Sequence, residues 1–107
     1  MTHDVILVRL VPKAKKQFEN ALYYPDGYIL RVRVWEVPEP VPPSGHRFKY
    51  SCFYGRPGER IVLYDNEKGK GDHRHYGERQ VPYKFRSVKA LMTDFLADVR
   101  RARGGDK

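Results

Sequence analysis

The sequence predicts an α+β fold: a small antiparallel β-sheet of four to six strands with one long C-terminal helix packed on a face. Short stretches of alternating apolar and polar residues predict the strands. Turn sequences such as Pro25-Asp26-Gly27 separate them, because proline sets φ and glycine accepts the left-handed conformation. The last element carries apolar residues at helical spacing. With 107 residues, the chain is expected to form a single domain, 1–107.

The first dozen residues, 1–12, are expected to be an N-terminal extension. Within them, Val5–Val11 is rich in β-branched and long apolar residues and ends at Pro12, which predicts a short strand. Arg9 interrupts this run, which is too short to cross a bilayer or to resemble a secretory signal. We therefore expect no membrane association.

The next stretch, 14–24, fits two elements. Its apolar residues share one face of a helix at i, i+3 and i+4, and a different selection of them shares one face of a strand. The residues concerned are Phe18, Ala21, Leu22 and Tyr24. Helix and strand therefore both remain open from the residues alone, although a strand would pair with the next element through the Asp26-Gly27 turn.

Residues 28–37 are the clearest predicted strand, because apolar residues alternate along them. The face expected to join the core consists of Leu30, Val32 and Val34. The opposite face mixes cations with apolar rings, which fits an RNA-contacting surface or a solvated outer face. That face consists of Ile29, Arg31, Arg33 and Trp35. The proline-rich stretch 37–45 is expected to be an extended connector, since proline cannot donate to a sheet ladder.

Further strands are expected over 46–54 and 59–65, and a short final one over 81–85. The first of these should place one set of residues on a common face, namely Phe48, Tyr50, Cys52 and Tyr54. The second should place Ile61 and Leu63 on one side.

Ser87 is the expected N-cap of a helix that runs to about Arg103. Its apolar stripe consists of Val88, Leu91, Met92, Phe95, Leu96 and Val99. Arg100, Arg101 and Arg103 near its end suit the negative pole of the helix dipole. Residues 104–107 are expected to be a flexible tail.

The charge balance favours a polyanionic partner. Lys and Arg number 21 against 13 Asp and Glu, which gives a net charge of +8 and a pI near 9.7. RNA and acidic proteins are the partners that such a surface attracts. The lone cysteine, Cys52, cannot form an internal disulfide, and this is typical of a protein of the reducing cytoplasm.

The segment from Tyr64 to Tyr76 concentrates groups that transfer protons or neutralise phosphate, and two glycines favour a loop. Transphosphorylation of RNA needs a base, an acid and a cation on the phosphate, which imidazole and basic side chains supply. The expected catalytic residues are His73, His75, Arg74, Asp65 and Asp72. The expected substrate-binding residues are Lys70, His46, Tyr76, Arg31, Arg33, Trp35 and Lys49. If the segment is extended, the two imidazoles share a face and Arg74 points away.

Two other chemistries fit this segment less well. His46, His73 and His75 with an aspartate would supply enough ligands for a divalent ion, but Lys70 and Arg74 would repel it. The Gly-Lys-Gly run lacks the spacing of a P-loop. We expect no metal and no cofactor, and ordinary polar turn material remains an alternative interpretation of the whole segment.

Several motifs together resemble the TumE family, toxins regarded as halves of type II toxin–antitoxin pairs. They span roughly Lys13 to Arg100. The motifs are Tyr23-Tyr24-Pro25-Asp26-Gly27, Val34-Trp35-Glu36-Val37-Pro38, His46-Arg47-Phe48-Lys49-Tyr50, the run from Tyr64 to His75, Pro82-Tyr83, and Asp94-Phe95 with Asp98-Val99. The resemblance implies a growth-inhibiting toxin, a helix-turn-helix antitoxin as partner, and a strand over 14–24. Family members often carry acidic residues before Pro-Tyr, where this chain has Gln80 and Val81.

The leading hypothesis is a metal-independent endoribonuclease toxin, with His73 and His75 as acid and base and with Arg74 and Lys70 on the phosphate. The alternative is a non-catalytic module that binds RNA or protein and blocks translation. A transferase toxin ranks last, because the sequence shows no recognisable donor site. The RNA target and the oligomeric state do not follow from the sequence.

Overall fold

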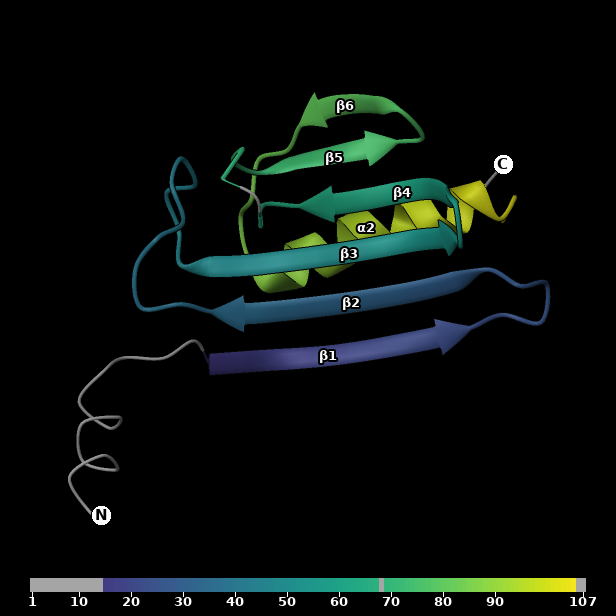
Figure 1. The fold of residues 1–107 in the computed structure, drawn as a ribbon, viewed down its shortest axis with the longest axis horizontal. Helices are drawn as coiled ribbons and strands as arrows, with labels where there is room; N and C mark the ends of the chain where they lie inside the picture. The colour runs from purple at the N-terminus through teal and green to yellow at the C-terminus, as the bar shows by residue number, and fades with distance from the viewer. Residues whose placement is uncertain (1–14, 68, 106–107) are drawn as a thin grey trace, which may run out of the picture.

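The computed structural model describes residues 15–67 and 69–105. Within them, six strands form one antiparallel sheet in the order of the chain, and a helix packs on one face (Figure 1). The elements are β1 Lys15–Tyr23, β2 Ile29–Glu36, β3 Phe48–Arg56, β4 Glu59–Asp65, β5 His73–Tyr76, β6 Arg79–Pro82 and α2 Val88–Ala102. The predicted fold class is confirmed. The predicted strand Val5–Val11, the extension 1–12 and the last two residues of the predicted tail lie outside the described residues.

The stretch 14–24, which fitted two elements, forms strand β1 from Lys15. It pairs with β2 through the turn at Pro25-Asp26-Gly27, and Leu22 stands opposite Leu30. Gly27 adopts φ +90°, a conformation that costs other residues more. Pairing with a neighbouring strand therefore decided between two periodicities that the local sequence left equal.

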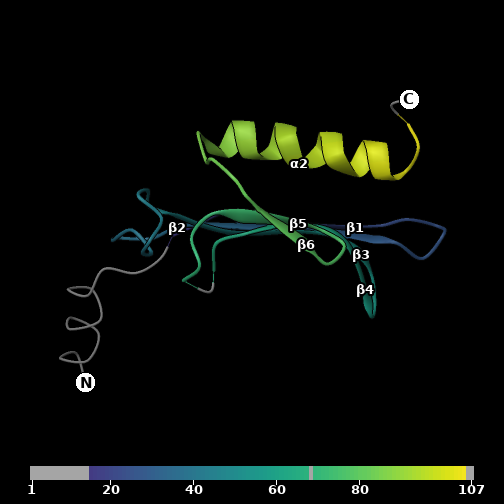
Figure 2. The same ribbon diagram turned by 90° about the horizontal axis from the view of Figure 1, so that it is seen from above.

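The core lies between the sheet and α2, which crosses β3 and β4 (Figure 2). The sheet contributes buried side chains from three strands, namely Leu30, Val32, Val34, Tyr50, Cys52, Tyr54, Val62 and Tyr64. The helix contributes Leu91, Phe95 and Val99. These sets match the predicted alternation on β2 and β3. The other face of the sheet carries no helix in the described part of the chain, and Figure 2 shows it uncovered.

One prediction about β4 is wrong. Ile61 packs against the core, whereas Leu63 lies in hollows on the uncovered face. The reason is a β-bulge: Tyr54 pairs with Val62 and Gly55 pairs with Arg60, so that Ile61 is an extra residue without a partner. A bulge reverses the alternation of side chains, and here it turns Arg60 toward the uncovered face.

Helix α2 begins where the sequence predicts. The Ser87 side chain accepts a hydrogen bond from the backbone N–H of Ala90 at 3.0 Å, as an N-cap does. One member of the predicted stripe is misplaced, since Leu96 is 41% exposed. The helix packs chiefly against β4 and β3 (Figure 1).

The segment predicted to be a single loop is only partly one. Tyr64 and Asp65 end β4, residues 66–67 and 69–72 form a turn region, and His73–Tyr76 is strand β5. The last strand, β6, is Arg79–Pro82 and not 81–85. The glycines of this segment favour a loop. Pairing with β4 on one side and with β6 on the other nevertheless holds His73–Tyr76 in an extended strand.

Candidate functional site

Strand β5 divides the predicted catalytic residues between two faces of the sheet. His73 and His75 lie on the uncovered face, and their ring centroids are 5.0 Å apart. Arg74 lies between them in sequence and points to the helix side, where it contacts Tyr64. Alternation along a strand produces this division. The two imidazoles are therefore brought together, and the arginine predicted beside them is not.

The two histidines line a hollow of about 370 Å³ on the uncovered face, which we call the histidine hollow. Its lining residues are Arg60, Leu63, Asp65, Lys70, His73 and His75. They come from β4, β5 and the turn region between these strands. The hollow thus joins two proton-transferring rings, two cations and one carboxylate.

His73 is held in one orientation. Its side chain is nearly buried, and Nδ1 donates a hydrogen bond to the Gly71 carbonyl at 2.9 Å, because a carbonyl oxygen can only accept. Nε2 is then the ring nitrogen that exchanges protons. Gly71 has φ +77°, and a Cβ there would lie 3.1 Å from Pro43 Cγ. The positive φ favours glycine here, and a side chain would in addition push Pro43 by a few tenths of an ångström.

His75 is poised to act as a base. Burial lowers its pKa below the ordinary value for histidine, and the nearby charges of Arg60 and His73 lower it further. Its ring is accordingly neutral at pH 7 and keeps a lone pair. Nδ1 is buried without a hydrogen-bond partner among the described residues. Such an atom is an exception in folded proteins, and Arg74 Nε on the other face of β5 is in the same state.

Asp65 and Lys70 complete the histidine hollow. Asp65 stands directly opposite His73 in the pairing of β4 with β5, and its carboxylate accepts a hydrogen bond from the backbone N–H of Glu67 at 2.5 Å. The exposed Lys70 lies in the turn region. A lysine at the rim can approach a phosphate without first leaving an ion pair in the core.

Arg74 belongs to a second cluster, between β4, β5 and α2. Its Nη1 donates to the Tyr64 hydroxyl at 3.1 Å, and its guanidinium lies 5.5–5.6 Å from the ring centroids of Tyr64, Tyr76 and Tyr83. Tyr64 and Tyr76 both donate to Asp98, Tyr76 at 2.7 Å. The tyrosines and Asp98 hold Arg74 and Tyr76 away from the histidine hollow.

Asp72 and His46 form a third cluster at the start of β3. Asp72 accepts hydrogen bonds from Ser44, His46 and Tyr50, the latter two at 2.7 Å. Burial raises the pKa of Asp72, but these three donors outweigh it and hold the pKa below the ordinary value. His46 Nδ1 also accepts from the Phe48 N–H at 3.1 Å. Both nitrogens of His46 are thus engaged within the fold.

The remaining predicted contacts lie along β2 and β3. Arg31 and Arg33 project from the uncovered face of β2, and Arg33 forms an ion pair with Glu67 at 3.4 Å. Trp35 and Lys49 stand opposite each other in the pairing of β2 with β3, so they share this face. A cationic strip therefore runs along β2 toward the turn region beside the histidine hollow.

The sequence analysis did not identify Arg60, Leu63 or Phe53 as residues that line hollows on the uncovered face. Phe53 alternates with the buried residues of β3, so its position on the uncovered face was readable from the same pattern. Arg60 was not readable, because the bulge at Ile61 brings it to that face. Among the described residues, no three His, Cys, Asp or Glu side chains gather as a metal ion would require.

A family model described as Toxin TumE matches residues 6–103. The chain belongs to the TumE toxin family. The match contains every residue of the histidine hollow, and it confirms the resemblance seen in the sequence. No curated protein and no solved structure matches the chain.

Membership of the TumE family gives this chain the role of a toxin, and a toxin of this kind implies an antitoxin partner. The described part of this TumE-family chain contains no helix of the length and apolar character needed to cross a membrane. The reaction must be argued from the site itself, because a family name states a biological role and not a mechanism.

Proposed function

We propose that this TumE-family chain is the toxin of a type II toxin–antitoxin system and cleaves RNA in the histidine hollow without a metal ion. One observation carries the proposal: the rings of His73 and His75 meet at 5.0 Å inside a hollow that also holds Lys70 and Arg60. Two imidazoles and two cations are the groups that transphosphorylation requires.

In the proposed reaction, His75 is the base. Its lowered pKa keeps the ring neutral, so it takes the proton of a ribose 2′-hydroxyl. The 2′-oxygen then forms a bond with phosphorus, and the bond from phosphorus to the 5′-oxygen breaks. His73 Nε2 donates a proton to that leaving oxygen. The products are a 2′,3′-cyclic phosphate and a 5′-hydroxyl, and no cofactor takes part.

Charge on the phosphate is stabilised by Lys70 and Arg60, both of which line the hollow. In this proposal Arg60 replaces Arg74, which faces the helix. Asp65 orients the site through its place beside His73, whereas Asp72 supports the fold through Ser44, His46 and Tyr50. The carboxylate and the cations thus act from the same face as the two rings.

The partner we propose is a small helix-turn-helix antitoxin that neutralises the toxin by direct binding. Support comes from the family and from the net charge of +8, which suits an acidic partner that competes with RNA. Co-expression with the neighbouring reading frame tests it: rescue of growth together with co-purification is the expected result, and growth arrest despite stable co-expression contradicts it.

Cleavage is tested with purified full-length protein, end-labelled RNA and EDTA. We expect wild type to release fragments that end in a 2′,3′-cyclic phosphate. His75→Ala should lower the rate by roughly 100-fold or more, the range for a lost general base. Lys89→Ala is a matched surface control, since Lys89 is exposed on α2. Intact RNA with wild type, or equal cleavage by wild type and His75→Ala, contradicts the enzyme.

A second candidate is a module that blocks translation by binding RNA without chemistry. The cationic strip on β2 favours it, because Arg31 and Arg33 can neutralise phosphates without the histidines. Growth assays separate the two candidates. Loss of toxicity on charge reversal at Arg31 and Arg33, with full toxicity of the His73→Ala, His75→Ala double variant, supports the binder. The opposite pattern supports the enzyme.

A further inference from the structure

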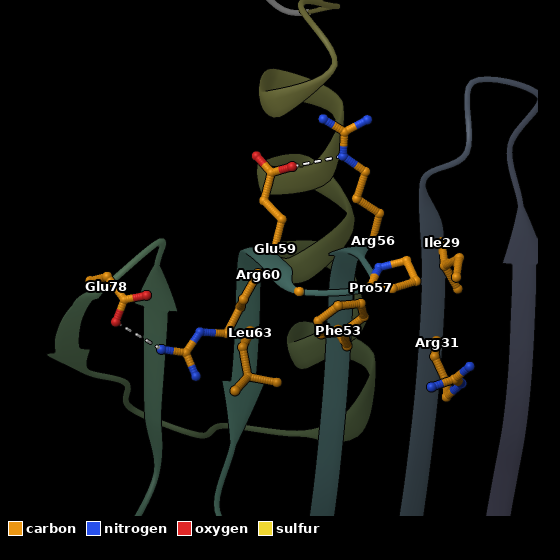
Figure 3. Close-up of a pocket in the computed structure, with 10 residues that line it drawn as sticks. Ile29, Arg31, Phe53, Arg56, Pro57, Glu59, Arg60, Leu63 and Glu78 are labelled. Atoms are coloured by element: carbon orange, nitrogen blue, oxygen red, sulfur yellow. Dashed lines mark hydrogen bonds and ion pairs between the residues drawn. The ribbon is translucent and has the colours of Figure 1, made fainter.

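A second hollow on the uncovered face has chemistry that the proposed cleavage does not use. It measures about 600 Å³, lies over β2, β3 and β4, and shares Arg60 and Leu63 with the histidine hollow (Figure 3). We call it the Phe53 hollow. The volume is that of a small-ligand site. Because the two hollows share these lining residues, they adjoin, and one extended ligand can occupy both.

The floor of the Phe53 hollow is apolar and contains an aromatic ring. Phe53 stands opposite Leu63 on β4 and opposite Arg31 on β2, and its side chain is half-buried. Ile29 and Pro57 extend the apolar surface (Figure 3). Flat apolar rings that remain accessible on a sheet are the surfaces on which nucleobases stack.

Two arginines at the rim of the hollow, Arg31 and Arg60, give it positive charge beside the apolar floor. Arg56 and Glu59 pair with each other at 2.7 Å at the β3–β4 turn, so their charges offset (Figure 3). Arg60 Nε donates to the Gly77 carbonyl at 3.3 Å, and its Nη2 approaches the fully exposed Glu78 side chain only at 3.9 Å. The attraction of such an exposed pair is small. Arg31 and Arg60 therefore remain able to face phosphates on either side of a base.

The sheet register sets the distance between the two hollows. Arg31, Phe53, Leu63 and His75 form one row of directly paired residues across β2 to β5. Adjacent strands lie about 4.8 Å apart, so the backbone at Phe53 is about 10 Å from that at His75. A base on Phe53 would thus belong to a nucleotide adjacent to the phosphate beside His75.

We propose that the Phe53 hollow is a nucleobase subsite for single-stranded RNA, in which one base stacks on the Phe53 ring next to the phosphate that is cleaved. Arg60 holds the phosphate between the two hollows, and Arg31 holds the phosphate on the far side. The subsite adds a substrate contact to the proposed ribonuclease function. Cleavage of the adjacent phosphate rests on that function, whereas base stacking on Phe53 does not. Because every base has a stacking face, the subsite selects unpaired RNA and not one base.

The subsite is tested by binding without cleavage. The probe is a short RNA with one 2-aminopurine and a 2′-O-methyl group on every ribose, which removes the attacking hydroxyl. Stacking on Phe53 should quench the fluorescence of 2-aminopurine when full-length wild type is added. Phe53→Leu keeps apolar volume but loses the ring, and we expect it to lose the quench and to bind about tenfold more weakly. Phe53→Trp should retain both.

One further variant serves as a control, and another tests the assignment of Arg31. Leu96→Ala truncates an exposed apolar side chain on the helix side and should behave as wild type. Arg31→Gln should reduce the slope of log affinity against log salt by about 0.7, the value for one phosphate contact on a single strand. An unchanged salt slope overturns the assignment of Arg31, and equal quenching by Phe53→Leu and wild type overturns the subsite.

The outcomes separate the subsite from the cleavage reaction. If His75→Ala quenches the probe fully and wild type cleaves unmodified RNA, both proposals are supported. If wild type quenches through Phe53 but cleaves nothing, the subsite stands and the ribonuclease function fails. If cleavage depends on His75 but Phe53→Leu has the KM of wild type, the function stands and the subsite fails.

Discussion

Strand β5 presents similar chemistry to two faces of one sheet, with different results. On the helix side, Arg74 contacts the hydroxyl of Tyr64 and lies among three tyrosine rings, with Asp98 bound to two of the same tyrosines. On the uncovered side, His75 lies in a hollow and its Nδ1 has no hydrogen-bond partner among the described residues. The covered cluster stabilises the fold, whereas the uncovered one remains available to a ligand.

The sequence neighbour of a catalytic candidate therefore need not share its role. His73, Arg74 and His75 are consecutive, yet the covering helix converts the middle residue into part of the scaffold. On the helix side, Tyr64 and Asp98 satisfy several of the buried polar groups, but Arg74 Nε is, like His75 Nδ1, buried without a hydrogen-bond partner among the described residues. What separates the two clusters is the hollow beside His75, which leaves one face of that residue open to a ligand.

The largest effect expected from this comparison is on stability. Asp98→Ala should lower the free energy of unfolding by about 2–4 kcal/mol, because it leaves buried tyrosine hydroxyls and Arg101 without their acceptor. His75→Ala should change it by about 0.5 kcal/mol or less. Urea unfolding followed by Trp35 fluorescence measures both. Similar losses for the two variants would break the distinction between the faces.

The same cluster predicts acid sensitivity. Burial raises the pKa of Asp98, but hydrogen bonds from Tyr64, Tyr76 and Arg101 outweigh it and lower the pKa. A carboxyl with a lowered folded pKa stabilises the protein above its unfolded pKa of about 3.9. That contribution is lost as the pH falls through the folded pKa. Asp98→Asn, compared with wild type between pH 6 and pH 2, should show a flatter loss of stability; a parallel loss would contradict this role.

A smaller effect is expected at the helix start. Ser87→Ala removes the N-cap of α2 and should cost about 1 kcal/mol of stability. The folded variant should cleave RNA as wild type does, because the histidine hollow lies on the opposite face. Urea unfolding and a cleavage assay at low denaturant check the two parts. Reduced cleavage by fully folded Ser87→Ala would show that the faces are coupled.

The smallest effect is a shift in pH dependence. His75 has a pKa lowered by burial, by Arg60 and by His73, so the acidic limb of kcat/KM should lie below pH 6.5. Arg60→Gln removes one positive charge, which should move this limb to higher pH. Arg31→Gln removes the same charge three strands away from His75 and should leave the limb in place. A limb that moves equally in both variants would count against His75 as the base.

Much of this arrangement was readable from residue patterns. The alternation over 28–37 identified Leu30, Val32 and Val34 as core, and Ser87 marked the helix start. The pairing of the two imidazoles on one face followed from period two as soon as the segment was extended. That condition was the part the pattern left open, since Gly69 and Gly71 favoured a loop.

Local sequence determined the alternation of strands, the turn at Asp26-Gly27, the stripe of α2 and the presence of two histidines beside basic residues. The tertiary structure alone decided that β5 is a strand, that Arg74 faces the helix, and that a bulge at Ile61 turns Arg60 toward His75. These outcomes depend on hydrogen bonds between strands and on which face the helix covers. Both depend on contacts between segments that are distant in the sequence, and a local pattern of residues does not encode such contacts.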